Sequence, residues 1–421
     1  MKRRTFLQSL AAAGVAMTAP GLVRAATASS SAPLVVLLPP WGTLTKDMTD
    51  RCQKETGVAV EIQTLGWDDI RTKIVTSMVA NTSPAQAAEV DWSWVGQFGS
   101  AGWFKPLDDK IPAATVADIP TAEIFRFGGK LMGLPYNNDF RILIYNSAHL
   151  KKAGVAAAPK TPQELLDAAK AIKAAGIAQY PIGLPLSATE GTSTAWYLLT
   201  MAFGGDLFDA NFNPLFTDKN SGGYKALEFV AAALKDGLID PAATGLKDVE
   251  VQELFKSGAI SFDVAGWAGN LAVYSDATKS KVASEVAAAL MPSTTGKSRT
   301  FGLPEAVGIP TLADNQDAAV KFINWIADPA NEIEIYNALG NLPPRLSVLK
   351  KLNEEGKLFA GDALLAQAKT TEPLFKQGTP GWYPEFSSAA ASSINQVAKG
   401  QLAVDAAVKQ IADRAKQAAK Q

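Results

Sequence analysis

The chain is poor in the two residue types that most often carry catalytic or metal-binding chemistry, with one cysteine and one histidine among 421 residues. A single cysteine excludes an intrachain disulfide. Cys52 shares a helical face with Leu44 and Met48, a pattern typical of a buried and unreactive thiol. His149 is expected to be an ordinary surface residue, so neither a histidine-based metal site nor a catalytic histidine is predicted.

A bias of charge is also absent, because 40 Lys and Arg residues stand against 41 Asp and Glu residues. A nucleic-acid partner is therefore not predicted, since such proteins carry a basic face. Charged residues interrupt every apolar run beyond the N-terminus, so no later segment reaches the roughly 20 residues of a membrane-spanning helix. Clustered metal ligands and a glycine-rich phosphate loop are lacking too, and no metal or cofactor is predicted.

The N-terminus has the three parts of an export signal. Residues 2–4 are basic, residues 9–23 form an uncharged run, and Val23-Arg24-Ala25 has small side chains at the two positions that a signal peptidase reads. The paired arginines before Phe6-Leu7 indicate that residues 1–25 are a twin-arginine signal peptide. An ordinary Sec signal is the alternative. Because no cysteine lies near the cleavage site, the mature chain is predicted to be periplasmic and soluble, without a lipid anchor.

Beyond this signal the chain alternates between strand and helix patterns. An apolar run at 34–38 precedes a helical pattern at 44–56, an alternating strand at 58–62 and a helix that opens at Asp68. This order indicates an α/β fold with a parallel sheet. The mature chain is more than twice the usual size of one domain, so two domains are expected. Three further strands are predicted, at residues 181–186, 259–264 and 306–309.

Tryptophan recurs directly after the predicted strands, where open α/β sheets bind their ligands. Trp41 follows the first strand, Asp91-Trp92-Ser93-Trp94 follows a strand that ends near residue 90, and Trp267 follows the strand at 259–264. An indole covers the apolar face of a sugar while a carboxylate binds its hydroxyls, so this combination favours a carbohydrate site. The alternative is ordinary core packing, which accounts for most tryptophans.

A polar segment at residues 133–141 lies between two apolar runs and contains Asn137, Asn138 and Asp139. Such a segment suits a crossing between domains whose polar groups face a cleft. An exposed turn explains the same residues equally well, because Asn and Asp are common turn residues.

Two other classes of function stay open on composition alone. A glycoside hydrolase or lyase needs only two carboxylates that meet in space, and no sequence pattern excludes that. A scaffold protein that binds other proteins would need an exposed apolar patch.

Several segments together resemble the family 1 extracellular solute-binding proteins, the maltodextrin-binding-protein-like receptors of ABC importers. The strongest is Gly129-Lys130-Leu131-Met132-Gly133-Leu134-Pro135-Tyr136. The others, in the order and spacing of that family, are residues 89–92, 102–107, 143–146, 152–154, 160–165, 254–259, 266–267 and 340–345.

This resemblance implies a two-lobe periplasmic-binding-protein fold of type II, with three interlobe crossings and a ligand cleft between the lobes. The implied lobes are residues 32–136 plus 292–328 and residues 137–291 plus 329–421. It implies a non-enzymatic monomer that delivers a sugar or polyol to membrane-embedded ABC permease subunits. The ligand contacts that it implies are Trp41, Asp91, Trp92, Asn137, Asn138, Asp139, Glu190, Trp267 and Arg345, to which the aromatic pattern adds Trp94.

The sequence departs from the maltodextrin pattern in ways that leave the ligand open. The loop after the first strand is Pro39-Pro40-Trp41-Gly42, without an Asp or Lys directly after it. A mono- or disaccharide or a polyol therefore fits as well as an oligosaccharide. Tryptophan-rich sites also bind quaternary ammonium solutes by cation–π attraction, so an osmolyte remains an alternative ligand.

The export signal generates the first prediction. Changing Arg3 and Arg4 together to Lys should block export, because the twin-arginine route requires the pair. Fractionation of cells that express the double variant measures this, and the intact mass of the exported wild type should correspond to cleavage after Ala25. Unchanged export of the double variant would assign the chain to the Sec route.

Overall fold

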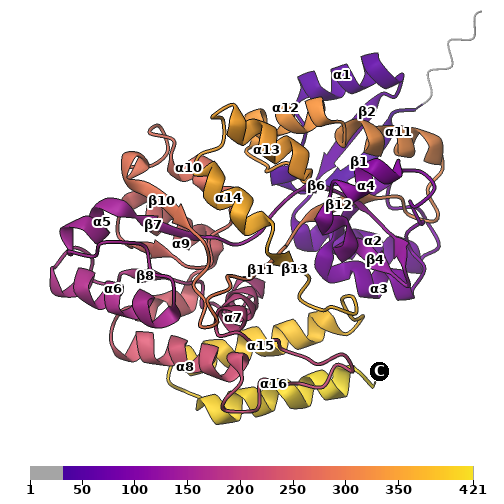
Figure 1. Ribbon diagram of the computed structural model, residues 1–421. Coiled ribbons are helices and arrows are strands. Elements are labelled where there is room, and N and C mark those ends of the chain that lie inside the picture. The colour runs from indigo at the N-terminus through magenta and orange to yellow at the C-terminus, as the bar shows by residue number, and fades with distance from the viewer. Residues whose placement is uncertain (1–31, 421) are drawn as a thin grey trace, which may run out of the picture. The chain divides into compact units, whose positions relative to one another are not determined.

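The computed structural model describes residues 32–420, so the predicted signal peptide lies outside the described residues. Within them, no helix is long and apolar enough to cross a membrane. The chain forms two main sheets with helices packed on their faces, which confirms the α/β prediction (Figure 1).

The first sheet has the strand order β2-β1-β3-β12-β6. β1 pairs in parallel with β2 and β3, whereas β12 is antiparallel to β3 and β6. Its strands are β1 (Leu34–Leu38), β2 (Val60–Thr64), β3 (Ala87–Asp91), β6 (Leu134–Asn137) and β12 (Glu305–Gly308). The helices that follow its strands or return the chain to it include α1 (Lys46–Thr56), α2 (Trp67–Val79), α3 (Val95–Ser100), α4 (Ala113–Ala117) and α11 (Gln316–Ile326).

Local sequence explains where these elements begin and end. The side chain of Thr45 accepts a hydrogen bond from the Met48 amide at the start of α1, and Gly57 ends the helix with φ = 76°, a conformation that suits glycine. Cys52 is buried on the inner face of this helix, as predicted.

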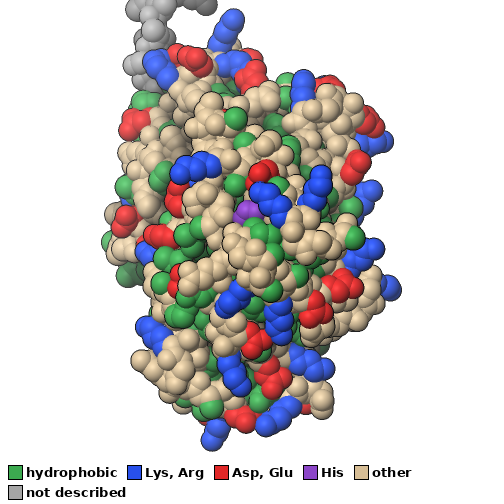
Figure 2. Space-filling model, turned by 90° about the vertical axis from the view of Figure 1, so that its left-hand side faces the viewer, with side chains coloured by type: hydrophobic (Ala, Val, Ile, Leu, Met, Phe, Trp, Pro, Cys, Tyr) green, Lys and Arg blue, Asp and Glu red, His purple; other side chains and the backbone are tan. Residues whose placement is uncertain are grey.

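The second sheet has the order β10-β7-β9-β8. Its strands are β7 (Leu143–Asn146), β8 (Ile182–Gly183), β9 (Phe262–Asp263) and β10 (Val286–Ala289). The helices around it are α5 (Ser147–Lys152), α6 (Pro162–Ala174), α7 (Glu190–Ala202), α8 (Gly222–Lys235), α9 (Asp248–Ser257), α10 (Asn270–Tyr274), α13 (Leu346–Glu354), α14 (Gly361–Ala368), α15 (Tyr383–Ala398) and α16 (Val404–Ala418). In Figure 1 the first sheet lies on the right and the second on the left. The face that Figure 2 shows carries interspersed basic and acidic side chains.

The chain passes between the sheets at residues 138–142 and returns at 290–304. A third passage follows α12 (Pro329–Leu339), which forms an ion pair with α1 through Arg51 and Glu334. The family resemblance places the third crossing near residue 329. Because α12 contacts α1, we propose instead that the third crossing follows α12.

His149 differs from the sequence-based prediction. It is buried rather than on the surface, and its Nδ1 lies 2.8 Å from the Ser261 hydroxyl. Burial lowers the pKa of this imidazole, with the Lys152 charge acting in the same direction. Ser261 lies next to β9, so His149 joins α5 to the second sheet.

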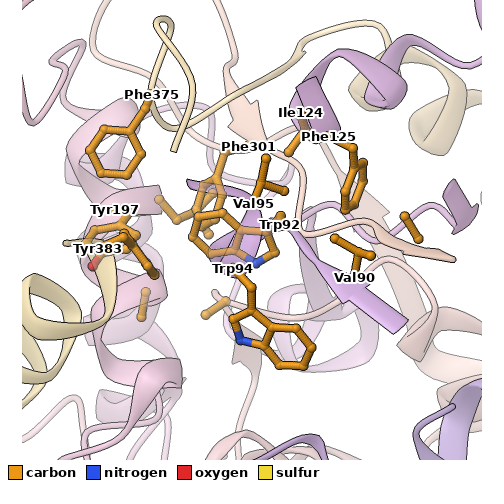
Figure 3. Packing of buried hydrophobic residues seen from close by; sticks show 14 of the residues in the cluster. Val90, Trp92, Trp94, Val95, Ile124, Phe125, Tyr197, Phe301, Phe375 and Tyr383 are labelled. Carbon is orange, nitrogen blue, oxygen red and sulfur yellow. The ribbon is translucent and has the colours of Figure 1, made fainter. Parts of the chain in front are cut away.

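An aromatic cluster connects the two sheets (Figure 3). Trp92 lies at its centre, with its ring centroid 4.9 Å from that of Tyr383 and 6.4 Å from that of Phe301. Tyr197 on α7 packs in the same cluster, 6.2 Å from Phe301. Three elements far apart in the sequence are thereby held against the turn η2 (Trp92–Trp94).

Gly96, next to this turn, generates a prediction about stability. A Cβ at this position would overlap the backbone of residues 379–381, which cannot move without displacing α15. We expect Gly96→Ala to lower the free energy of unfolding by about 1–3 kcal/mol. Gly245→Ala is the matched control, since a Cβ there meets nothing within 4 Å. Chemical denaturation measures both, and equal stability of the two variants would contradict this role.

Candidate functional site

A cavity of about 300 Å³ lies at the ends of the strands that the sequence pattern singled out. It is lined from the first sheet and its loops and from the second sheet and its helices. Eight of the ten predicted site residues line it: Trp41, Asp91, Trp92, Asn137, Asn138, Asp139, Glu190 and Trp267.

Two predicted residues do not line this cavity. Trp94 is fully buried and packs on Trp67 and Phe98, with ring centroids 5.0 and 5.6 Å away. Arg345 is turned away, because its guanidinium binds the Ala327 carbonyl at 2.7 Å and the Glu332 carboxylate at 3.2 Å. Trp94 also borders an adjoining cavity that Trp41, Glu190 and Trp267 line, so its role as a ligand contact stays a prediction, whereas Arg345 joins α12 to α13.

The loop that holds Arg345 still contributes a residue to the cavity. Asn341 lines it, and its amide donates a hydrogen bond of 3.0 Å to the Trp41 carbonyl. Leu342 and two prolines separate Asn341 from Arg345 in the sequence. The first side chain therefore reaches the cavity, whereas the second contacts Ala327 and Glu332.

The indoles in the lining differ in how much surface they offer a ligand. Trp41 is 43% exposed and its Nε1 donates to Glu305, whereas Trp92 is only 4% exposed within the aromatic cluster. Trp267 is half-buried, and the Arg141 guanidinium lies over its ring at 5.1 Å. Trp41 and Trp267 therefore present the available flat faces, and Trp92 mainly packs.

Asp91 organises one wall rather than offering free acceptors. One carboxylate oxygen accepts from the Ser93 amide at 2.8 Å and from the Ser93 hydroxyl, and the other accepts from Trp67 Nε1 at 3.1 Å. Burial raises the pKa of Asp91, and the Ser93 and Trp67 hydrogen bonds partly offset that rise. Trp67 also lines the cavity and was missed by sequence reasoning, which assigned no role to the start of that helix.

Glu305, the first residue of β12, is the most connected group that sequence reasoning missed. Its carboxyl group accepts hydrogen bonds from Trp41 Nε1, from Asn137 Nδ2 at 3.0 Å and from the Tyr136 hydroxyl at 3.4 Å. Burial raises its pKa to about 8. The same Tyr136 hydroxyl lies 2.8 Å from Glu89, whose pKa burial and the Glu305 charge hold well above its usual range. The only signal in the sequence was the strand predicted from residue 306, which places Glu305 at a strand end.

Other carboxyl groups in the lining are also shifted towards protonation. Burial raises the pKa of Asp139 to about 7, although the Arg141 charge opposes this. Burial likewise raises the pKa of Glu190 to about 7, while hydrogen bonds from Ser387 and Tyr383 act against it. Glu190 is the first residue of α7, so the helix N-terminus positions it at the cavity.

Three buried polar atoms in the lining have no hydrogen-bond partner among the described residues. They are the donors Arg141 Nη1 and Trp267 Nε1 and the acceptor Asn138 Oδ1. Buried polar groups are normally paired, so these atoms are candidates for contact with a ligand. Arg141 belongs to the predicted polar segment, but sequence reasoning did not select it.

Between residues 32 and 420, no group of three His, Cys, Asp or Glu side chains is placed to hold a metal ion. The cavity instead combines indole faces, carboxyl groups and unpaired donors and acceptors, which is the chemistry of a binding site for a polar solute.

Comparison with known proteins agrees with this geometry. Residues 40–333 match the family described as bacterial extracellular solute-binding protein. The chain belongs to that family. Its recognition from the sequence, and the two-lobe fold that the resemblance implied, are both confirmed.

Individual relatives are distant but match over most of their length. A putative binding protein of Brucella abortus (strain 2308) is 24% identical over 85% of both chains. A probable amino-acid ABC transporter periplasmic-binding protein of Sinorhizobium fredii is 25% identical over 83% of both. Among solved structures, maltose-bound MalE3 of T. maritima has a TM-score of 0.81 at 20% identity, covering 91% of this chain and 99% of that one. A solute-binding protein of Agrobacterium radiobacter K84 in complex with ribitol has a TM-score of 0.80 at 19% identity, covering 91% and 98%.

The carboxyl groups of this solute-binding protein generate a prediction about pH. Asp139, Glu190 and Glu305 have folded-state pKa values of about 7, 7 and 8, well above the roughly 4 of the unfolded chain. Between about pH 4 and 8 the folded state therefore binds more protons than the unfolded state does. Each group's contribution to the free energy of unfolding is greatest below about pH 4. The contribution falls by about 1.4 kcal/mol per pH unit as the pH rises, until the pH has passed the folded pKa of the group.

We therefore expect the ligand-free protein to lose stability in denaturant titrations from about pH 5 to about pH 8. His149 opposes this trend, but it is one group and its effect is complete above about pH 6.5. Glu305→Gln should flatten the dependence. Stability that rises across this range would contradict the buried-carboxyl assignment.

Proposed function

We propose that this protein captures a mono- or oligosaccharide or a polyol in the periplasm and delivers it to the membrane-embedded permease subunits of an ABC importer. The observation that supports a carbohydrate most directly is the mixture of unpaired donors and acceptors, Arg141 Nη1, Trp267 Nε1 and Asn138 Oδ1, beside the indole faces of Trp41 and Trp267. Each sugar hydroxyl both donates and accepts, so it requires such a mixture.

The size of the site suits a range of carbohydrates. The cavity of about 300 Å³ is adjoined by one of about 640 Å³ that Trp41, Glu190 and Trp267 also line, and both volumes lie within the range for small-molecule sites. The ligands bound in related structures include maltose, tagatose, ribitol, mannitol and acarbose, which are sugars, polyols or sugar analogues. We infer a mono- or oligosaccharide or a polyol.

Capture is proposed to work by closure of the two lobes. Trp41 and Asp91 approach the ligand from the first sheet, whereas Glu190 and Trp267 approach it from the second. A ligand that touches both sides binds the closed state more tightly and shifts the population towards it. We propose that the protein works as a monomer, without catalysis and without a lipid anchor.

A thermal-shift screen of sugars, polyols and quaternary ammonium solutes tests the proposal. A ligand at 100 times its Kd should stabilise the protein by about 2.7 kcal/mol. Prolonged incubation with each hit, followed by product analysis, tests the hydrolase or lyase alternative. Turnover, or a response confined to compounds without hydroxyl groups, would overturn the proposal.

Truncation of the exposed indoles tests the site itself. We expect Trp41→Ala and Trp267→Ala each to weaken binding of the identified ligand by about 2 kcal/mol or more, roughly thirtyfold. Trp41→Ala should disturb packing little, since this side chain is 43% exposed, and should lower stability by about 1–3 kcal/mol through the lost hydrogen bond to buried Glu305. Phe359→Ala is the control, because Phe359 is exposed and does not line the cavity. Equal affinities of Trp41→Ala and the control would remove Trp41 from the site.

A further inference from the structure

The cavity has an excess of acidic groups. Five carboxyl groups line it, from Asp91, Asp139, Glu190, Asp248 and Glu305, and the lining contains one arginine and no lysine. The chain as a whole has a net charge of only −1, and the face in Figure 2 shows both signs interspersed. The lining is therefore more acidic than the chain as a whole.

Two of these carboxyl groups remain free to bind a ligand. Asp91, Glu190 and Glu305 accept hydrogen bonds from neighbouring side chains, as described above. The Asp248 carboxylate, at the first position of α9, accepts no hydrogen bond from the described residues and packs against Gly191. The Asp139 carboxylate has one charged neighbour, Arg141, whose Nη1 is 3.7 Å away.

The positive charge of Arg141 is already offset by neighbouring carboxyl groups of the protein. Its guanidinium lies over the Trp267 ring and next to Asp139. It also acts on Asp263, whose pKa burial raises to about 6 while Tyr274 and Arg141 partly offset that rise. One guanidinium thus faces two carboxyl groups and leaves Asp248 without a cation.

Asn138 provides a second and independent indication of what the ligand must offer. Asn138 lines the same cavity and is 4% exposed, and its Oδ1 has no donor among the described residues. Asp139, Asp248 and Asn138 therefore present acceptors that lack donors. A hydroxyl supplies one donor, whereas an ammonium supplies three together with the missing positive charge.

We propose that the solute carries a protonated amine beside its hydroxyl groups, as an amino sugar or an amino polyol does, and that Asp139, Asp248 and Asn138 bind the ammonium group. The proposal rests on the carbohydrate function proposed above and narrows its ligand class. The Asp139 and Asp248 carboxylates are both partly buried, and a bound cation offsets the cost of their partial desolvation. The indoles of Trp41 and Trp267 attract the same charge through their ring faces.

Matched ligand pairs test this directly by calorimetry near neutral pH. D-Glucitol is compared with 1-amino-1-deoxy-D-glucitol, and D-glucose with D-glucosamine and with N-acetyl-D-glucosamine, whose nitrogen carries no charge. We expect at least one amine to bind about tenfold or more tightly than its hydroxyl and acetylated counterparts, since hydrogen bonds to charged groups are the stronger ones. Higher salt should narrow that ratio.

Asp248→Asn should reduce the amine-to-hydroxyl affinity ratio about tenfold, because it keeps the shape and removes the charge. Asp317→Asn is the matched control, an exposed aspartate on α11 outside the cavity. Asp139→Asn serves as a second variant if Asp248→Asn does not fold, as judged by its thermal midpoint.

The outcomes separate the two proposals. Neutral sugars or polyols that bind as tightly as their amines would overturn the inference and leave the carbohydrate function standing. Failure of every sugar and polyol, charged or neutral, would overturn the carbohydrate function itself. An amine preference that Asp248→Asn and Asp139→Asn both leave unchanged would overturn the assigned site.

Discussion

The site depends on a short segment, residues 138–141, whose backbone is hydrogen-bonded on both edges. On one edge the Leu303 amide donates to the Asp139 carbonyl at 2.7 Å, and on the other the Ala268 amide donates to the Phe140 carbonyl at 2.9 Å. The Asn138 amide donates to the Leu342 carbonyl of a third segment at 2.8 Å. These bonds hold Asn138, Asp139 and Arg141 at the junction of all three crossings, where they face the cavity.

The register of β12 against β6 and β3 is the second constraint, because it places Glu305 opposite both Asn137 and Asp91. A register shift in the β12–β6 pairing at Glu305 and Ala306 lets the glutamate reach the Asn137 amide and the Trp41 indole. The network continues through Tyr136 to Glu89 at the back of the sheet. Burying these carboxyl groups costs stability unless they hold protons or gain partners. This loss of stability has a benefit for binding, because the polar groups of the site are already desolvated and oriented before a ligand arrives.

Tryptophan has three separate uses in this protein. Trp92 and Trp94 lie in the core, Trp67 orients Asp91, and Trp41 and Trp267 offer ring faces to the cavity. All five are near strand ends, so position along the chain alone does not separate them. The neighbours decide the use, since Tyr383 and Phe301 cover Trp92 while nothing comparable covers Trp41.

The sequence by itself determined the α/β class, strands such as β1, β3 and β12, helices such as α1 and α2, the family, and the eight predicted site residues that line the cavity. These features depend on short-range patterns: apolar runs and alternation in strands, caps such as Thr45 and Gly57 at helix ends, and polar or aromatic residues directly after a strand. Tertiary structure alone decided that Glu305 meets Trp41, a residue 264 positions away, that Arg345 pairs with Glu332 instead of facing the cavity, and that Asp248 joins the site. The physical reason is that these contacts follow from strand register and from the three crossings. A local pattern of residues does not predict which distant side chain it will contact.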